Sequence, residues 1–268
     1  MTFDELMDSY RNDDNYVIKK SNQGSNICYV FFSSHGLYKE NNNIDVLKKV
    51  HDTNRYEWLS IFENQKISEN CKKAIFVRDI NKIFYIEGIN KRIDSLEKLA
   101  LFLKTETEGM DVYLVGSSAG GYAAYIVSGF LNNVKRIYSF GGVVDLNEHT
   151  TYLEYIKAHK NRNVVEVVNS INQNAFIVHF CGSQNTESIN GINIIQRLIS
   201  DDRIAIVPLK SIEHAPRPTG RDIIKLLACS DKHLLKIKRK TDGKKEISNF
   251  SFSTINIGFL RATLYKIF

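Results

Sequence analysis

The sequence predicts an α/β protein with a mostly parallel central sheet and helices on both of its faces. Apolar runs of strand length alternate along the chain with segments of helical periodicity, which is typical of βαβ units. One run, at 111–115, also leads through a glycine-rich turn directly into an apolar helix. We expect strands at 26–33, 73–77, 111–115, 135–140, 174–180 and 203–209.

The segments between these strands predict the helices that cover the sheet. Two further apolar runs, at 56–62 and 82–88, are strand candidates that would form an antiparallel pair. The stretch 112–134 has no charged residue and is long enough to cross a bilayer, but the three glycines and two serines within 116–121 favour a buried strand, turn and helix. We expect helices near 92–104, 119–131, 150–160, 189–199 and 219–228.

The turn after strand 111–115 has the pattern G-x-S-x-G, from Gly116 to Gly120. In a nucleophile elbow of this kind, a strand enters a helix through so sharp a turn that the central serine is strained and exposed above the sheet. Glycines are required beside it because side chains would strike the neighbouring strand and helix. The pattern therefore predicts an α/β-hydrolase fold with little or no cap, in which Ser118 is the nucleophile.

A serine hydroxyl needs a base to take its proton, and this fold places a histidine after the last strand. His214 lies five residues after the strand at 203–209 and precedes a predicted helix, so it is the expected base. His179 lies inside a strand and is expected to be a core residue.

The acid departs from the usual pattern. It is expected in the loop after the strand at 174–180, where the usual position is Asn185. An amide can orient an imidazole but cannot offset the charge of an imidazolium. We favour Glu187, two residues further on, with Asp145 after the preceding strand as the alternative. A serine–histidine dyad supported by Asn185 also remains open.

The oxyanion hole needs two backbone N–H donors. The N–H of Ala119, which follows the nucleophile, supplies the first. The second is expected from the loop after the strand at 26–33, where Ser34 or His35 would donate and Gly36 would allow close approach.

Several of these segments resemble the bacterial capsule polysaccharide O-acetyltransferases of the α/β-hydrolase fold. The resemblance is carried by GSSAGGYAA after DVYLV, by FIVHFCGSQNTES and RIAIVPLKSIEH, and more weakly by AIFVRDINKIFYIEGI. It covers about half of the domain. Within the weaker segment, Arg78 and Asp79 match a VRD pattern and are expected to form a structural ion pair.

The resemblance implies a ping-pong reaction without a bound cofactor. Ser118 would attack the thioester of acetyl-CoA, the co-substrate, and His214 would accept its proton. The acetyl group would then pass to a hydroxyl of a poly- or oligosaccharide. Asn185 stands where the family has aspartate, so the acid is not carried over.

Composition limits the class of protein further. The four cysteines are scattered without a C-x-x-C pair, which predicts buried thiols rather than disulfides, and no histidine spacing predicts a metal site. The acidic N-terminus has no apolar stretch of a secretory signal, so we expect a cytoplasmic location.

The positive charge is concentrated near the C-terminus. Residues 225–268 hold ten Lys and Arg against three Asp and Glu. We expect an α/β-hydrolase-like catalytic domain at 1–228 and a basic, aromatic-containing extension at 229–268. The extension would make peripheral contact with the inner membrane face, an anionic capsule polymer or the capsule machinery, and we expect no nucleic-acid partner. A solvated end that packs its aromatic side chains on the domain is an equally good interpretation.

Two other functions use the same features. An esterase, thioesterase or polysaccharide deacetylase needs the same serine, histidine and oxyanion hole, and differs in admitting water to the acyl-serine. A non-catalytic scaffold in a surface-glycan or secretion complex is the second alternative, although an intact Ser118 with His214 argues against it.

Overall fold

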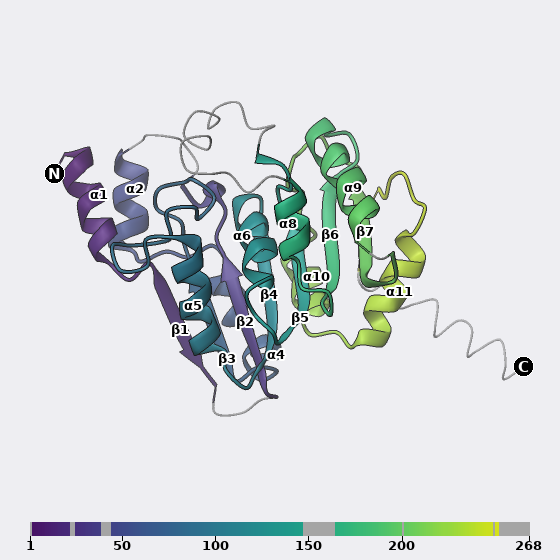
Figure 1. Ribbon diagram of the computed structural model, residues 1–268, viewed down its shortest axis with the longest axis horizontal. Helices are drawn as coiled ribbons and strands as arrows, with labels where there is room; N and C mark the ends of the chain where they lie inside the picture. Colours follow the sequence, from purple (N-terminus) through teal and green to yellow (C-terminus); the bar gives the residue numbers. More distant parts are fainter. Residues whose placement is uncertain are drawn as a thin grey trace, which may run out of the picture.

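The computed structural model describes residues 2–21, 25–38, 44–146, 164–199, 201–248 and 250–251. Its centre is a seven-stranded sheet in the order β1-β3-β2-β4-β5-β6-β7 (Figure 1). Only β1 is antiparallel to its neighbour, and the other strands are parallel. The predicted fold class is confirmed. The strands are β1 (Tyr16–Lys20), β2 (Ile27–Phe32), β3 (Lys73–Val77), β4 (Asp111–Ser117), β5 (Val134–Phe140), β6 (Phe176–Gly182) and β7 (Ile204–Leu209).

Helices cover both faces of the sheet (Figure 1). Side chains of α5 (Leu96–Glu106), α6 (Ala119–Ser128) and α8 (Val164–Ser170) join the core on one face. Those of α4 (Gln65–Ser68), α10 (Gly220–Leu227) and α11 (Asp231–Thr241) join the core on the other. Because both faces are covered, the central strands are buried at nearly every position rather than at alternate ones.

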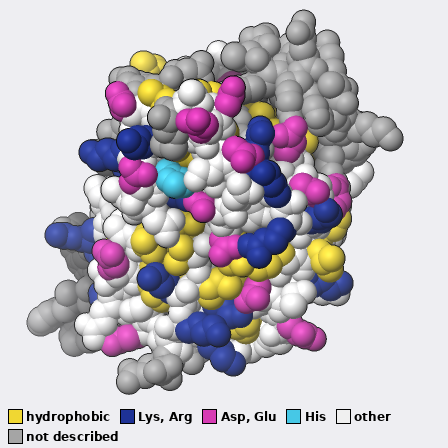
Figure 2. Space-filling view, turned by 90° about the vertical axis from the view of Figure 1, so that its left-hand side faces the viewer, with side chains coloured by type: hydrophobic (Ala, Val, Ile, Leu, Met, Phe, Trp, Pro, Cys, Tyr) yellow, Lys and Arg dark blue, Asp and Glu magenta, His cyan; other side chains and the backbone are white. Residues whose placement is uncertain are grey.

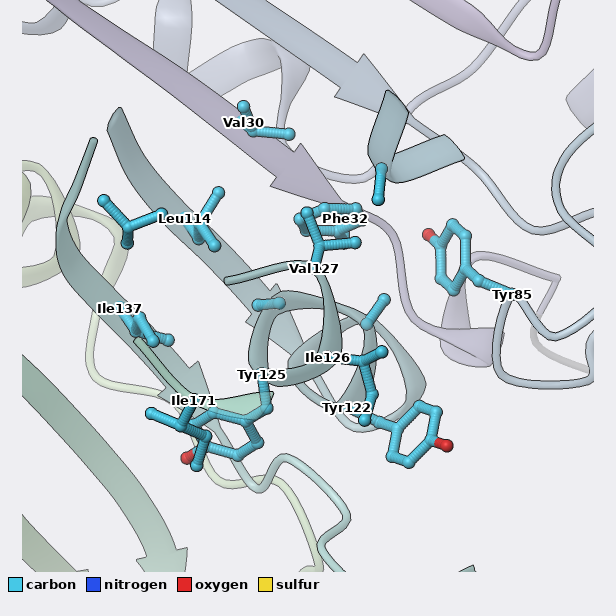
Figure 3. Close-up of a cluster of buried hydrophobic side chains, with 14 of the residues drawn as sticks. Val30, Phe32, Tyr85, Leu114, Tyr122, Tyr125, Ile126, Val127, Ile137 and Ile171 are labelled. Carbon is cyan, nitrogen blue, oxygen red and sulfur yellow. The ribbon is translucent and has the colours of Figure 1, made fainter. Parts of the chain in front are cut away.

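Helix α6 lies at the centre of the first core. All ten of its residues are buried, and Figure 3 shows it surrounded by side chains of β2, β4 and β5. Tyr122 and Tyr125 leave α6 in different directions, with Tyr125 beside Ile171 (Figure 3). A helix buried on all sides fixes the position of its own N-terminus, where Ser118 lies.

The first part of the predicted C-terminal extension packs against the sheet. Leu234 and Ile237 of α11 are buried in the second core, and Phe250 contacts the ring of Phe180 edge-on. Ile247 forms a bridge to Leu209 at the end of β7.

Two predicted strands are wrong. The segment 56–62 contains a short helix, α3 (Leu59–Phe62), and 82–88 forms turns with positive φ at Lys82, Phe84 and Tyr85. The cause of these turns is Asp79, whose buried carboxylate accepts four backbone N–H groups at 2.8–3.1 Å. The predicted helix at 150–160 lies outside the described residues.

The expected ion pair between Arg78 and Asp79 is also wrong. Arg78 is buried, donates from Nε to Asn15 at 2.9 Å, and lies over the rings of Tyr10 and Tyr56. The two residues follow the end of β3, and the two charges bind separate partners.

The sequence analysis did not predict β1 or the first two helices. Helix α1 (Phe3–Asn12) begins with a capping box between Thr2 and Glu5, and α2 (Ile44–Asp52) packs beside it. At this end of the sheet acidic and basic side chains are interspersed (Figure 2), as in the ion pairs Lys91–Asp8 and Arg92–Asp14. One more helix, α9 (Thr186–Leu198), follows β6.

Burial dominates the chemistry of the four cysteines. Cys28, Cys71 and Cys181 are fully buried and Cys229 is half-buried, and none of them forms a disulfide. Burial raises the pKa of each thiol to about 12. Within the described part of the chain, no helix is long and apolar enough to cross a membrane.

Candidate active site

Ser118 occupies the sharp turn between β4 and α6. Its φ of 49° and ψ of −117° belong to a backbone region that residues other than glycine rarely adopt. Close packing holds the turn in place. A Cβ on Gly116 would lie 2.1 Å from the carbonyl oxygen of Gly120, and a Cβ on Gly120 would lie 2.4 Å from that of Phe32. The turn therefore needs glycine at both positions, as the sequence pattern predicts.

The two neighbouring serines differ in exposure. Ser117 is fully buried, whereas Ser118 is partly exposed. The backbone N–H of Ser118 donates to the carbonyl of Phe140 at the end of β5, at 2.9 Å, which ties the turn to the neighbouring strand. Of the two, Ser118 is the one whose hydroxyl a substrate can reach.

The parallel strands bring the other predicted residues to the same edge of the sheet. The carboxyl ends of parallel strands lie together, and each candidate follows one of these ends. Candidates follow β2, β4, β5, β6 and β7 in turn: Ser34 and His35, Ser118, Asp145, Glu187 and His214.

The side chains of His214 and Glu187 lie together in the structure and form an ion pair when the imidazole is protonated. Their Nδ1 and Oε2 atoms lie 3.4 Å apart, and both side chains are about one-quarter to one-third exposed. The loop of His214 is fixed on two sides. Its carbonyl accepts from the Ser188 hydroxyl at 3.0 Å, and its backbone packs so closely on Gly141 that a Cβ there would lie 2.3 Å from this oxygen.

Asn185 has a structural contact instead. Its side chain caps α9 by accepting from the Ser188 N–H at 2.9 Å, and its amide donates to the carbonyl of Ile212 at 3.3 Å. It therefore positions the start of α9, where Glu187 lies in the first turn. Asp145 lines the same small cavity as Glu187 and His214. The catalytic roles of all these residues stay predictions.

The two predicted second donors of the oxyanion hole differ. The Ser34 N–H donates to Oε2 of Glu57, and the Ser34 hydroxyl donates to Oε1 at 2.9 Å. Because this N–H is bound to a carboxylate here, His35 is the better candidate of the pair. Ala119 is the first residue of α6, whose initial N–H groups lack intrahelical acceptors.

Sequence reasoning missed the residues that surround Ser34. Glu57 is one-tenth exposed and also binds Arg217, whose guanidinium lies 5.0 Å from the ring centre of Trp58. These contacts span 23 and 160 residues of the chain, so no local motif could have revealed them. They connect the loop of the predicted oxyanion hole with the loop of His214.

Helix α6 adds an electrostatic contribution. Its N-terminus points its unpaired N–H groups and its positive dipole end toward the turn of Ser118, which favours negative charge there. Among the described residues, no three His, Cys, Asp or Glu side chains are grouped so that they could hold a metal ion. The arrangement offers a serine, a histidine–carboxylate pair and an anion-stabilising helix end.

The strand order and the strained serine turn define an α/β-hydrolase fold, and solved structures agree. The capsule O-acetyltransferase of Neisseria meningitidis serogroup A is similar with a TM-score of 0.55 and 13% identity, over 81% of this chain and 92% of that one. The 2,6-dihydroxy-pseudo-oxynicotine hydrolase is similar with a TM-score of 0.50 and 12% identity, over 80% of this chain and 63% of that one.

At these identities the likeness shows the fold alone. No protein-family model matches the sequence, and no curated protein matches it.

Proposed function

We propose that this protein is a serine-dependent acyltransferase that moves an acetyl group from acetyl-CoA to a hydroxyl of a bacterial surface polysaccharide. The observation that carries the proposal is the strained turn of Ser118, at the same sheet edge as the Glu187–His214 pair. Likeness of fold to a capsule O-acetyltransferase supports the transfer of an acetyl group and the class of acceptor.

In the first half-reaction the Ser118 hydroxyl attacks the thioester carbon while His214 takes its proton. The negative oxygen of the tetrahedral intermediate accepts from the N–H of Ala119 and from the second donor at His35. The carbon–sulfur bond then breaks, and the proton on His214 passes to the thiolate of CoA. Glu187 stabilises the imidazolium that forms between these steps.

In the second half-reaction a sugar hydroxyl takes the place of CoA. His214 accepts the proton of this hydroxyl as its oxygen attacks the acetyl-serine, and then returns a proton to Ser118 as the ester forms. Transfer requires that the acceptor, rather than water, reaches the acyl-serine. The basic helix α11, with Lys238, Arg239 and Lys240 in its last turn, would favour an anionic polymer near the enzyme.

The test is intact-protein mass spectrometry after incubation with acetyl-CoA in the absence of an acceptor. We expect wild type to gain the mass of one acetyl group. We expect Ser118→Ala to gain none, with turnover lower by about 10⁴-fold or more. Ser117→Ala is the matched control, because it removes a buried hydroxyl one residue away, and it should keep the adduct.

Other outcomes would point elsewhere. Free CoA released without an adduct would indicate hydrolysis, because water would then hydrolyse the acyl-serine faster than it forms. An adduct that persists in Ser118→Ala would contradict the assignment of the nucleophile. Absence of both adduct and CoA release would remove acetyl-CoA as the donor.

A further inference from the structure

A chain of buried polar groups leads from the end of β5 to the Glu187–His214 pair. His179 lies in β6, is 2% exposed, and its Nδ1 lies 2.5 Å from the hydroxyl oxygen of Tyr125 on α6. The Ser139 side chain also lies near the Tyr125 hydroxyl, and its hydroxyl oxygen accepts from the N–H of Gly142 at 3.1 Å. A histidine inside a hydrophobic core is costly unless its nitrogens are used.

The polar groups of this chain favour one direction of proton donation. Burial raises the pKa of Tyr125, so the phenol keeps its proton. Ser139 accepts from the backbone and can donate its own proton to the phenol oxygen. Tyr125, which is fully buried, must place its proton on an acceptor, and Nδ1 of His179 is the acceptor beside it. We therefore assign the proton of His179 to Nε2.

His179 stays neutral because of its surroundings. Burial lowers its pKa to about 3, and the nearby charge of His214 lowers it further. Its ring lines a cavity of about 10 Å³ together with Asp145, Glu187 and His214. A cavity of this size has room for about one water molecule, which can carry a hydrogen bond between its walls.

We propose that His179 is a positioning residue for the predicted acid: its Nε2–H donates into this cavity and holds the Glu187 carboxylate, ionised, against His214. The inference rests on the proposed function for its catalytic meaning. It also explains how the predicted acid can work from an unusual position. Glu187 stands two residues beyond the usual position and has a longer side chain than aspartate. A longer side chain needs a further contact to remain in one orientation.

The groups facing His179 come from four elements. Tyr125 comes from α6, Asp145 from the segment after β5, Glu187 from α9 and His214 from the loop after β7. Among them only the two carboxylates carry negative charge, which makes them the strongest acceptors for an N–H group. Glu187 is the one that forms the ion pair with His214, so it is the acceptor whose orientation matters.

The deciding experiment combines NMR with a double-mutant cycle on the full chain. In protein labelled with ¹⁵N-histidine, the Nδ1 proton of His214 should give a far-downfield resonance. We expect His179→Phe to lose this resonance, and Tyr125→Phe, which keeps its ring, to weaken it. The rate of acetyl-serine formation should fall about 10- to 100-fold in His179→Phe. In a Glu187→Gln background the same substitution should change the rate less than about twofold.

Several results would overturn the proposal. One is an unchanged resonance in His179→Phe, and another is an equal loss of rate in both backgrounds, which would mean that His179 supports only packing. A normal rate with a lower melting temperature would lead to the same conclusion. If wild type forms no acetyl-serine, the acyltransferase proposal fails, but the NMR result still decides whether His179 holds the pair.

Discussion

Two neighbouring segments hold residues at positive φ, and they are stabilised in different ways. In the elbow, Ser118 is held by close backbone packing around Gly116 and Gly120. In the loop 82–85, three residues with side chains are held by one carboxylate, that of Asp79, which accepts four N–H groups. The first device depends on the absence of side chains, and the second depends on a charge.

The elbow and the loop 82–85 also differ in the side chains that they present. The elbow presents a partly exposed side chain at the sheet edge where the ion pair lies. The loop presents buried rings, and Phe84 contacts the rings of His35 and Tyr122 on either side. Strained backbone therefore occurs both at the predicted nucleophile, Ser118, and in a loop that packs behind the predicted oxyanion hole.

The largest expected effect comes from filling the space that the elbow needs. Gly116→Ala should lower the free energy of unfolding by at least about 3 kcal/mol, because its Cβ meets backbone that cannot move aside. Gly220→Ala is the control, since no atom lies within 4 Å of its Cβ, and it should change stability by less than about 1 kcal/mol. Urea denaturation measures both. Equal stabilities would show that the turn tolerates side chains.

The loop should lose stability when its carboxylate is neutralised. Asp79→Asn replaces a charged acceptor of four N–H groups by an amide, and we expect a loss of about 2 kcal/mol. Acylation should slow less than in Ser118→Ala, because the loop acts only through His35 and Tyr122. Parallel urea denaturation and rate measurements test this. A complete loss of acylation with unchanged stability would make Asp79 part of the site.

The smallest expected effect concerns strain at Ser118 itself. Ser118→Gly should be more stable than Ser118→Ala by about 1 kcal/mol, because glycine adopts this backbone conformation without strain. Thr105, exposed in α5, provides the comparison: there the glycine variant should be the less stable one by about 1 kcal/mol. Thermal denaturation of the glycine and alanine variants at both positions measures this difference in order. If the alanine variant is the more stable one at both positions, the elbow is unstrained.

The sequence predicted those parts that depend on local pattern. Six of the strands and the glycine spacing around Ser118 were found because each depends on a run of neighbouring residues. Strand β1 was missed because it is short, partly exposed and ends in two lysines. Helix α9 begins three residues earlier than expected, because Asn185 caps it.

Contacts between distant residues were beyond the reach of such patterns. The 82–88 run has the length and apolar composition of a strand, but the buried charge of Asp79 turns it into a loop. The links of Glu57 to Ser34 and Arg217 join three separate loops. The contact of His179 with Tyr125 is likewise a contact between distant residues, so the sequence predicted only that His179 lies in a strand and is buried.

The burial of the cysteines bears on how the proposed release of CoA can be assayed. Thiols with a pKa of about 12 present almost no thiolate at neutral pH, so they react slowly with chromogenic disulfide reagents. Free CoA carries an ordinary exposed thiol and reacts quickly. Release of CoA can therefore be followed continuously in the cuvette, with little background colour from the protein and without replacing any cysteine.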